Sequence, residues 1–172
     1  AAKPEEIRNI FPNAKSVGEA FGVMLVRNNE FMYDVATFRS DGEYKDHRHP
    51  TNVTFTDAKH DAQRRDFTIN GLFEDPVEED IIDFVGGKDD LHARIIRAIG
   101  DPHQRLADDH LRMLRAVRFA ANFSFSIETE TADAIREHAS QLSGISKERI
   151  GGELRRMLTH QNRGDAVWEV QY

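Results

Sequence analysis

The alternation of apolar and polar residues near the start of the chain predicts strands. Residues 21–27 and 31–39 both show this period of two, and the polar segment between them is typical of a hairpin turn. In the second strand, Asp34 falls on the same face as apolar residues, so a carboxylate is expected within an otherwise apolar row. A short helix over residues 3–11 is expected before this hairpin.

Between residues 40 and 100, short periodic segments alternate with turn residues. The expected elements are a loop at 40–50, a helix at 57–65, strands at 81–85 and 94–100, and a helix within 86–94. Asp57 has the side chain of a good N-cap for the first of these helices. Gly86 and Gly87 favour a tight turn from strand to helix over a phosphate-binding loop.

After Gly100 the pattern becomes one of successive helices. Their expected ranges are 102–123, 128–142, 146–160 and 163–171. We therefore divide the chain into a mixed α/β part, residues 1–100, and an all-α part, residues 101–172. The strands of the first part lack an obvious opening edge, so we expect that an N-terminal portion precedes residue 1.

The segment RRDFTINGLF, residues 64–73, places charged and amide side chains beside apolar ones. Its alternation predicts a buried strand in which Phe67 and Ile69 enter the core while the polar residues face the other way. A structural turn explains part of this pattern, but it does not require two arginines, an aspartate and an amide together. We therefore interpret the segment as one wall of a ligand pocket.

Charged residues recur every three positions along the helix expected at 102–123. They are Asp109, Arg112, Arg115 and Arg118. In most helices such spacing reflects a solvated face with ion pairs between neighbouring turns. The functional alternative is that an aspartate three residues before an arginine offers a hydrogen-bond acceptor beside a donor fork.

An acceptor beside a donor matches two of the four RNA bases. Cytosine and adenine each present an exocyclic amino donor beside an unprotonated ring nitrogen, whereas guanine and uracil present a carbonyl oxygen beside a ring N–H. A pair formed by Asp109 and Arg112 would therefore accept the first two bases and reject the others. Arg115 and Arg118 would remain to bind phosphate.

Composition restricts the remaining possibilities. The net charge of -7 argues against indiscriminate nucleic-acid binding through a basic surface, so any phosphate recognition must be local. Arginine is far more frequent than lysine, which favours planar, bidentate contacts with phosphates and base edges. The sequence contains no cysteine and no run of about 20 apolar residues, which suits a cytoplasmic protein without a membrane segment.

In their order along residues 21–158, these motifs resemble those of the bacterial class II tRNA nucleotidyltransferase and poly(A) polymerase family. The matching segments are VATFRSDGEYKDHRHP, RRDFTINGLF, IIDFVGGKDDLHARIIRAIG, DPHQRLADDHLRMLRAVRFAANFSFSI and ISKERIGGELRRML. The resemblance implies an α+β fold, with a polymerase β-like nucleotidyltransferase palm that has a mixed sheet and is N-terminally incomplete here. An all-α neck domain follows this palm, so the head is expected at residues 1–100 and the neck at 101–172.

The resemblance also assigns roles to individual residues. The residues implied to bind the nucleotide are Arg65, Asp66, Asn70, Asp109, Arg112, Arg115 and Arg118. The first three match positions associated with phosphate and sugar, and Asp109 with Arg112 matches the pair that reads the base edge. Asp46 and Arg48 belong to a matching flexible loop, residues 40–50, that helps to position the substrate.

The sequence departs from the family at the metal-binding motif. The glycine-rich GG-x-x-R-D segment and the following D-x-D pair, which bind two Mg²⁺ ions in the family, are absent from these 172 residues. We expect no metal ligand set in this chain and no activity from the chain as given. Asp34 is a candidate auxiliary catalytic carboxylate. Asp108 stands where the family usually has glutamate.

The resemblance implies a Mg²⁺-dependent enzyme that adds C and/or A residues from CTP or ATP to an RNA 3′ end, above all that of tRNA. Poly(A) polymerase of the same family is one alternative, and a non-catalytic nucleotide- or RNA-binding remnant is another. Gly151 and Gly152 lie within an expected helix. For these we favour close packing of helices over an approach of RNA.

Overall fold

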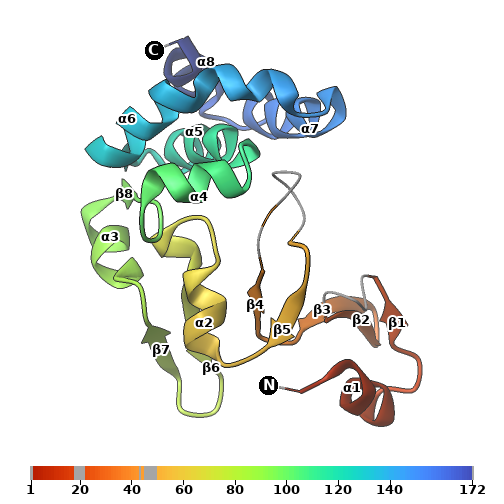
Figure 1. The fold of residues 1–172 in the computed structure, drawn as a ribbon. Coiled ribbons are helices and arrows are strands. Elements are labelled where there is room, and N and C mark those ends of the chain that lie inside the picture. Colours follow the sequence, from red (N-terminus) through yellow and green to blue (C-terminus); the bar gives the residue numbers. More distant parts are fainter. Residues whose placement is uncertain (1, 18–21, 43, 45–49, 172) are drawn as a thin grey trace.

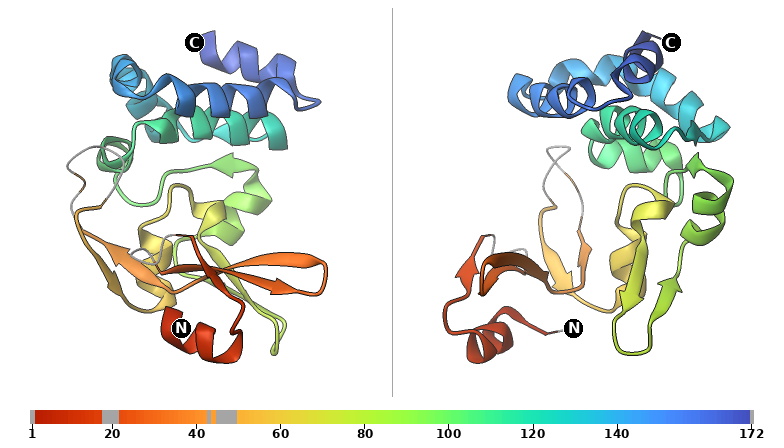
Figure 2. Two further views of the ribbon diagram at one scale, coloured as in Figure 1. Left: turned by 90° about the vertical axis from the view of Figure 1, so that its right-hand side faces the viewer. Right: turned by 180° about the vertical axis from the view of Figure 1, so that it is seen from behind.

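The computed structural model describes residues 2–17, 22–42, 44 and 50–171 of the chain. It confirms the expected α+β class: small sheets dominate the first part and helices the second. Figure 1 shows the helices α4 to α8 at one end of the molecule and the strands β1 to β5 toward the other, and both views in Figure 2 agree. No helix among the described residues is long and apolar enough to span a membrane.

The first sheet contains the predicted hairpin. Helix α1 (Pro4–Ile10) precedes three antiparallel strands, which are β1 (Lys15–Ser16), β2 (Val23–Asn28) and β3 (Phe31–Ala36). Ile7, Met24 and Val26 are buried together between helix and sheet. Asp34 lies opposite Leu25 on the other face, where it is exposed to solvent. The structure therefore confirms the hairpin and leaves Asp34 outside this core.

A second hairpin leads to the short helix before the RRDFTINGLF segment. It consists of β4 (Arg39–Asp41) and β5 (Val53–Phe55), followed by α2 (Ala58–Gln63). The predicted N-cap is confirmed, because Asp57 Oδ1 accepts a hydrogen bond from the His60 backbone N–H at 2.9 Å. Helix α2 ends just before Arg64, so the two arginines follow a helix C-terminus.

The strand expected across Phe67 to Asn70 is wrong. Phe67 forms a single bridge with Ala98, and the next residues form a short 3₁₀ helix, η2 (Thr68–Asn70). Thr68 is buried and its hydroxyl donates to Asp90 Oδ2 at 2.7 Å, a contact that local alternation does not reveal. A strand resumes at β6 (Leu72–Asp75), which pairs antiparallel with β7 (Asp80–Asp83).

The tight turn at Gly86 and Gly87 is confirmed. Gly86 has φ +79°, a left-handed conformation, and α3 (Gly87–Ala93) begins immediately after it. The Asp83 carboxylate accepts hydrogen bonds from the backbone N–H groups of the four residues 85–88 at 2.9–3.1 Å. A carboxylate of the chain itself therefore occupies this nest of donors, and the phosphate-binding alternative has no support here.

The second part of the chain is a bundle of helices with one break that the sequence did not predict. The helices are α4 (Pro102–Asp108), α5 (Leu111–Phe123), α6 (Thr129–His138), α7 (Lys147–Leu158) and α8 (Arg163–Gln171), with a 3₁₀ segment η3 (Ala139–Gly144) after α6. The single helix expected at 102–123 is interrupted because Asp109 is extended, at φ -151° and ψ 104°. The strand expected at 94–100 is reduced to β8 (Ile95–Ile96), which pairs in parallel with β9 (Ser126–Ile127).

Two apolar clusters hold α5 in place. One packs Leu114, Val117 and Met157 together between α5, α7 and α8, and the other packs Phe67 and Ile96 against α5. Close helix packing is the wrong explanation for Gly151 and Gly152, because a Cβ added at either residue meets no described atom within 4 Å. Helix α5 is thus fixed between the two parts of the chain, which positions its polar face.

Candidate nucleotide-binding site

A cavity of about 520 Å³ brings together most of the predicted nucleotide-binding residues. It is lined by Arg64, Arg65, Asp66, Asn70, Asp109, Leu111, Arg112, Arg115, Phe119 and Arg149. Three parts of the chain that are distant in sequence therefore meet here: the segment after α2, the stretch from Asp109 through much of α5, and the start of α7. Six of the seven predicted residues are among these, and Arg118 is the exception.

Asp66 joins the RRDFTINGLF segment to α5. Its Oδ2 accepts hydrogen bonds from Arg115 at 2.6 and 2.7 Å, and its Oδ1 accepts from Asn70 Nδ2 at 3.0 Å and from the Phe67 N–H at 2.9 Å. Burial by itself would raise the pKa of Asp66, but the charge of Arg115 and these hydrogen bonds outweigh it, so the pKa lies below its usual value. Asp66 is therefore held as a carboxylate that orients Arg115 and Asn70.

Asp61 orients the two arginines that open the segment. This aspartate is 2% exposed, and its Oδ1 accepts from Arg64 at 2.7 and 2.9 Å while its Oδ2 accepts from Arg65 at 3.0 and 3.1 Å. Burial would raise the pKa of Asp61, but the backbone N–H of Arg39 and the charge of Arg64 lower it below its usual value. Arg65 also donates to the Asn70 carbonyl at 2.7 Å, so two partners, Asp61 and Asn70, orient its guanidinium.

Asp109 occupies the break between α4 and α5. Its Oδ1 accepts from the Leu111 backbone N–H at 3.0 Å, and its Oδ2 accepts from Arg149 of α7 at 2.7 Å. The carboxylate thus accepts a hydrogen bond at the start of α5 and binds α7 at the same time. It does not pair with Arg112 through their side chains, although both line the cavity. The Arg112 backbone N–H instead donates to the Asp109 carbonyl at 3.0 Å.

Arg112 is held by carbonyl oxygens. It is 8% exposed, and it donates to the carbonyl of Arg105 at 2.7 Å and to that of Arg64 at 3.4 Å. Arg105 in turn donates to the carbonyls of Gln63, Arg64 and Ile99. A solvated helix face is therefore the wrong interpretation of Arg112, because its guanidinium is buried where α4, α5 and the end of α2 meet.

The remaining predicted residues lie elsewhere or outside the described residues. Arg118 binds Glu153 of α7 at 2.6 Å and lies 4.1 Å above the Phe119 ring, so it links α5 to α7 without itself lining the cavity. Asp34 is exposed on β3 and does not line the cavity. Asp46 and Arg48 fall in a part of the loop that lies outside the described residues.

A second cavity of about 580 Å³ lies beside the first and shares Arg64 with it. Among its lining residues are Ser40, Asp41 and Tyr44, which come from the described ends of that loop. Burial and a hydrogen bond to Asp41 raise the pKa of Tyr44 to about 12, so this hydroxyl stays protonated. The loop ends thus contribute polar groups next to the arginine-rich cavity.

Arg64 lines the cavity as part of the segment predicted to form its wall, although no individual role was assigned to it. Sequence reasoning missed Leu111, Phe119 and Arg149 as lining residues. Arg149 lies 40 residues from its partner Asp109, so no local spacing connects the two. Its presence in the segment ISKERIGGELRRML, which matches the family, was the only hint.

Among the described residues, no group of three or more metal-binding side chains lines the cavity. One group of three or more histidine and carboxylate side chains lies close enough to bind a metal ion, and none of its members lines the cavity. Mg²⁺ prefers an octahedral set of oxygen ligands, and this group contains two histidines. No catalytic step through Mg²⁺ can therefore be built on these residues.

Family models match both parts of the chain. Residues 1–97 match the poly(A) polymerase head domain, and residues 124–167 match a region described as the probable RNA and SrmB-binding site of polymerase A. The first match covers more than half of the chain. The chain therefore belongs to the tRNA nucleotidyltransferase and poly(A) polymerase family.

Particular relatives are CCA-adding enzymes. The enzyme of Enterococcus faecalis is 46% identical over 164 residues, which is 95% of this chain and 40% of the relative. The structure of the Bacillus stearothermophilus CCA-adding enzyme in complex with CTP matches with a TM-score of 0.86 and 36% identity, over 96% of this chain and 40% of that one. A Thermotoga maritima CCA-adding enzyme complexed with tRNA matches with a TM-score of 0.74 and 26% identity, over 97% of this chain and 38% of that one. The chain thus spans about 40% of the length of such relatives.

Proposed function

We propose that this chain forms the nucleotide-selecting part of an enzyme that adds C and A residues to the 3′ end of tRNA without a template. The observation that carries the proposal is a cavity lined by five arginines and two aspartates in a chain of net charge -7. A nucleoside triphosphate is a compact polyanion, and guanidinium groups bind its phosphates bidentately. The similarity to a CCA-adding enzyme determined with CTP supports this assignment.

In this proposal Asp109 and Arg112 select the base. The Asp109 carboxylate has lone pairs beyond those used by Leu111 and Arg149, so an exocyclic amino group of cytosine or adenine can donate to it. Arg112 donates to the adjacent ring nitrogen. Guanine and uracil would place a carbonyl oxygen against the carboxylate, where neither group donates a hydrogen, and they are rejected for that reason.

Arg65, Asn70 and Arg115 hold the triphosphate and ribose in this proposal. Asp61 and Asp66 fix these side chains before the nucleotide arrives, so less side-chain entropy is lost on binding. The RNA 3′-hydroxyl then attacks the α-phosphate and pyrophosphate leaves. We expect the whole protein to require Mg²⁺ and to act in the cytoplasm, while the residues described here decide which nucleotide reacts.

Nucleotide binding tests the site without requiring catalysis. We expect the wild-type chain to bind ATP and CTP more tightly than GTP and UTP, and the Asp109→Ala and Arg112→Ala variants to lose that preference. Arg136→Ala serves as the matched control, since Arg136 is an exposed arginine paired only across one helical turn with Asp133. If both cavity variants keep the preference for ATP and CTP over GTP and UTP, Asp109 and Arg112 do not read the base. Failure of the wild-type chain to bind any triphosphate would sink the site itself.

The product distinguishes this function from its alternatives. The whole protein, supplied with Mg²⁺, CTP and ATP, should extend tRNA that ends before CCA and tRNA that ends in CC, but not an unstructured RNA. Long adenylate tails on the unstructured RNA would indicate a poly(A) polymerase. Nucleotide binding without any extension would indicate a non-catalytic module.

A further inference from the structure

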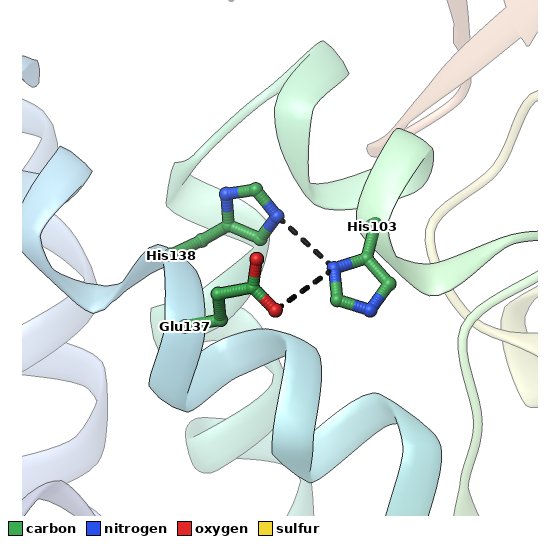
Figure 3. A group of neighbouring side chains, drawn as sticks. All are labelled: His103, Glu137 and His138. Carbon is green, nitrogen blue, oxygen red and sulfur yellow. Dashed lines mark hydrogen bonds and ion pairs between the residues drawn. The ribbon is translucent and has the colours of Figure 1, made fainter.

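Three potential metal ligands meet between α4 and α6, outside the nucleotide cavity. His103 lies in the first turn of α4, and Glu137 and His138 are the last two residues of α6. His103 Nδ1 is 3.3 Å from His138 Nε2 and 3.7 Å from Glu137 Oε2. Figure 3 shows both side chains of α6 directed toward the ring of His103.

Two of the three distances between these ligand atoms are close to those around a tetrahedral metal ion, and all three atoms lie within 4.8 Å of one another. Ligand atoms that lie about 2.1 Å from Zn²⁺ in tetrahedral geometry are separated from one another by about 3.4 Å. The contact between the two histidine nitrogens, at 3.3 Å, already has this length. The contact with Glu137 is slightly longer at 3.7 Å, and this side chain is 70% exposed, so it can rotate without disturbing the core.

The scaffold beneath the three ligands is rigid. Leu106 and Ala134 are fully buried and belong to one apolar cluster with Met113, so α4 and α6 are packed against each other below the site. His103 Nδ1 and His138 Nε2 face each other above this packed base, and neutral imidazole nitrogens are common metal ligands.

We propose that His103, Glu137 and His138 bind one Zn²⁺ ion, with water as the fourth ligand. Two imidazoles and one carboxylate suit Zn²⁺ and not Mg²⁺, so this site is separate from any Mg²⁺ used in nucleotidyl transfer. The ion joins α4 to α6. Because α4 carries Arg105, which binds the carbonyls of Gln63 and Arg64, the ion also stabilises one border of the nucleotide cavity.

Calorimetric titration of the metal-free 172-residue chain with ZnCl₂ tests the proposal. We expect a single equivalent to bind to the wild type. The His103→Ala and His138→Ala variants should bind more weakly by at least the roughly 10- to 100-fold that the loss of an outer partner already costs a metal site. His92→Ala is the matched control, since His92 is an exposed histidine on α3 away from the group, and it should bind Zn²⁺ like the wild type.

Two further measurements distinguish the loss of a metal ligand from misfolding of a variant. Zn²⁺ should raise the thermal unfolding temperature of the wild type and of His92→Ala but not of His103→Ala, because an ion bound only to the folded state stabilises it. Co²⁺ should give the visible absorption of a tetrahedral complex in the same two proteins. Equal Zn²⁺ affinity in the wild type and both cluster variants, or no binding by the wild type, would overturn the proposal. A Glu137→Gln variant that keeps wild-type affinity would remove Glu137 from it.

Discussion

Asp61 and Asp109 both bind arginines next to the nucleotide cavity, yet their surroundings differ. The Asp61 side chain is 3% exposed, both of its oxygens are occupied by Arg64 and Arg65, and it does not line the cavity. The Asp109 side chain is 18% exposed, binds one arginine and one backbone N–H, and lines the cavity. Contact with arginine is therefore not what marks a ligand-binding carboxylate. We propose that acceptor capacity facing a cavity is the better criterion.

The largest expected effect is on stability, when the Asp61 carboxylate, which binds an arginine through each oxygen, is removed. We expect Asp61→Ala to lower the free energy of unfolding by about 3 kcal/mol, because Arg64 and Arg65 lose the buried carboxylate that they share, although each keeps another partner. Urea denaturation measures this. Asp133→Ala removes an exposed carboxylate that also pairs with an arginine, and it should cost less than about 1 kcal/mol. Equal losses in the two variants would contradict the distinction between buried and exposed pairs.

The second largest effect is expected on base preference, when the cavity-lining carboxylate of Asp109 is changed. In Asp109→Asn the side-chain carbonyl still accepts from Leu111, so the start of α5 is retained, while an amide donor replaces the oxygen that accepts from Arg149 and that would accept from the base. We expect the preference for ATP and CTP to fall by about tenfold or more, since one good base contact is worth about 1–3 kcal/mol. Competition binding of the four nucleotides measures this. Asp61→Asn should instead weaken all four nucleotides alike, and a selective loss there would contradict our interpretation.

Low pH is expected to reduce the stability of the folded chain through protonation of Asp61 and Asp66. The pKa values of Asp61 and Asp66 lie below their usual range in the folded chain, so the unfolded state binds more protons as the pH falls. Their contribution to stability is complete above the ordinary aspartate pKa of about 4 and is lost as the pH drops through the lowered values. We expect Asp66→Asn to show a shallower loss of stability below about pH 4 than the wild type, measured by denaturation at several pH values. A steeper loss in the variant would contradict this sign.

The smallest effect lies on α7, the helix that carries Arg149. Gly151 is exposed within this helix and an added Cβ meets no described atom within 4 Å. Gly151→Ala should therefore raise the free energy of unfolding by about 0.5–1 kcal/mol while nucleotide affinity stays unchanged. A reduced affinity for tRNA at unchanged nucleotide affinity in the whole protein would support the alternative that RNA approaches these glycines.

Local sequence patterns predicted much of the fold because those elements depend on neighbouring residues. The hairpin of β2 and β3, the Asp57 cap of α2 and the turn at Gly86 all follow from residues within a few positions. The elements that were wrong depend on distant partners. Thr68 enters a 3₁₀ helix and binds Asp90, which lies 22 residues further along the chain.

The contacts of the candidate site also depend on distant partners, so the sequence predicts them only in part. Spacing and family resemblance selected Asp109 and Arg112, and both line the cavity. Spacing suggested a direct pair on one continuous helix, but the helix breaks at Asp109, whose carboxylate turns instead to Leu111 and to Arg149. Arg149 comes from another helix, so only the tertiary structure reveals that the Asp109 carboxylate has a second partner.

In the proposed site, Asp109 accepts a hydrogen bond from the exocyclic amino group of the base. The most direct measurement compares binding of ATP with that of purine riboside triphosphate, which lacks only this amino group, in the wild type and in Asp109→Asn. We predict that the wild type binds ATP more tightly by about tenfold, the value of one such contact, and that Asp109→Asn shows no such difference. The same ratio in both proteins would contradict the account.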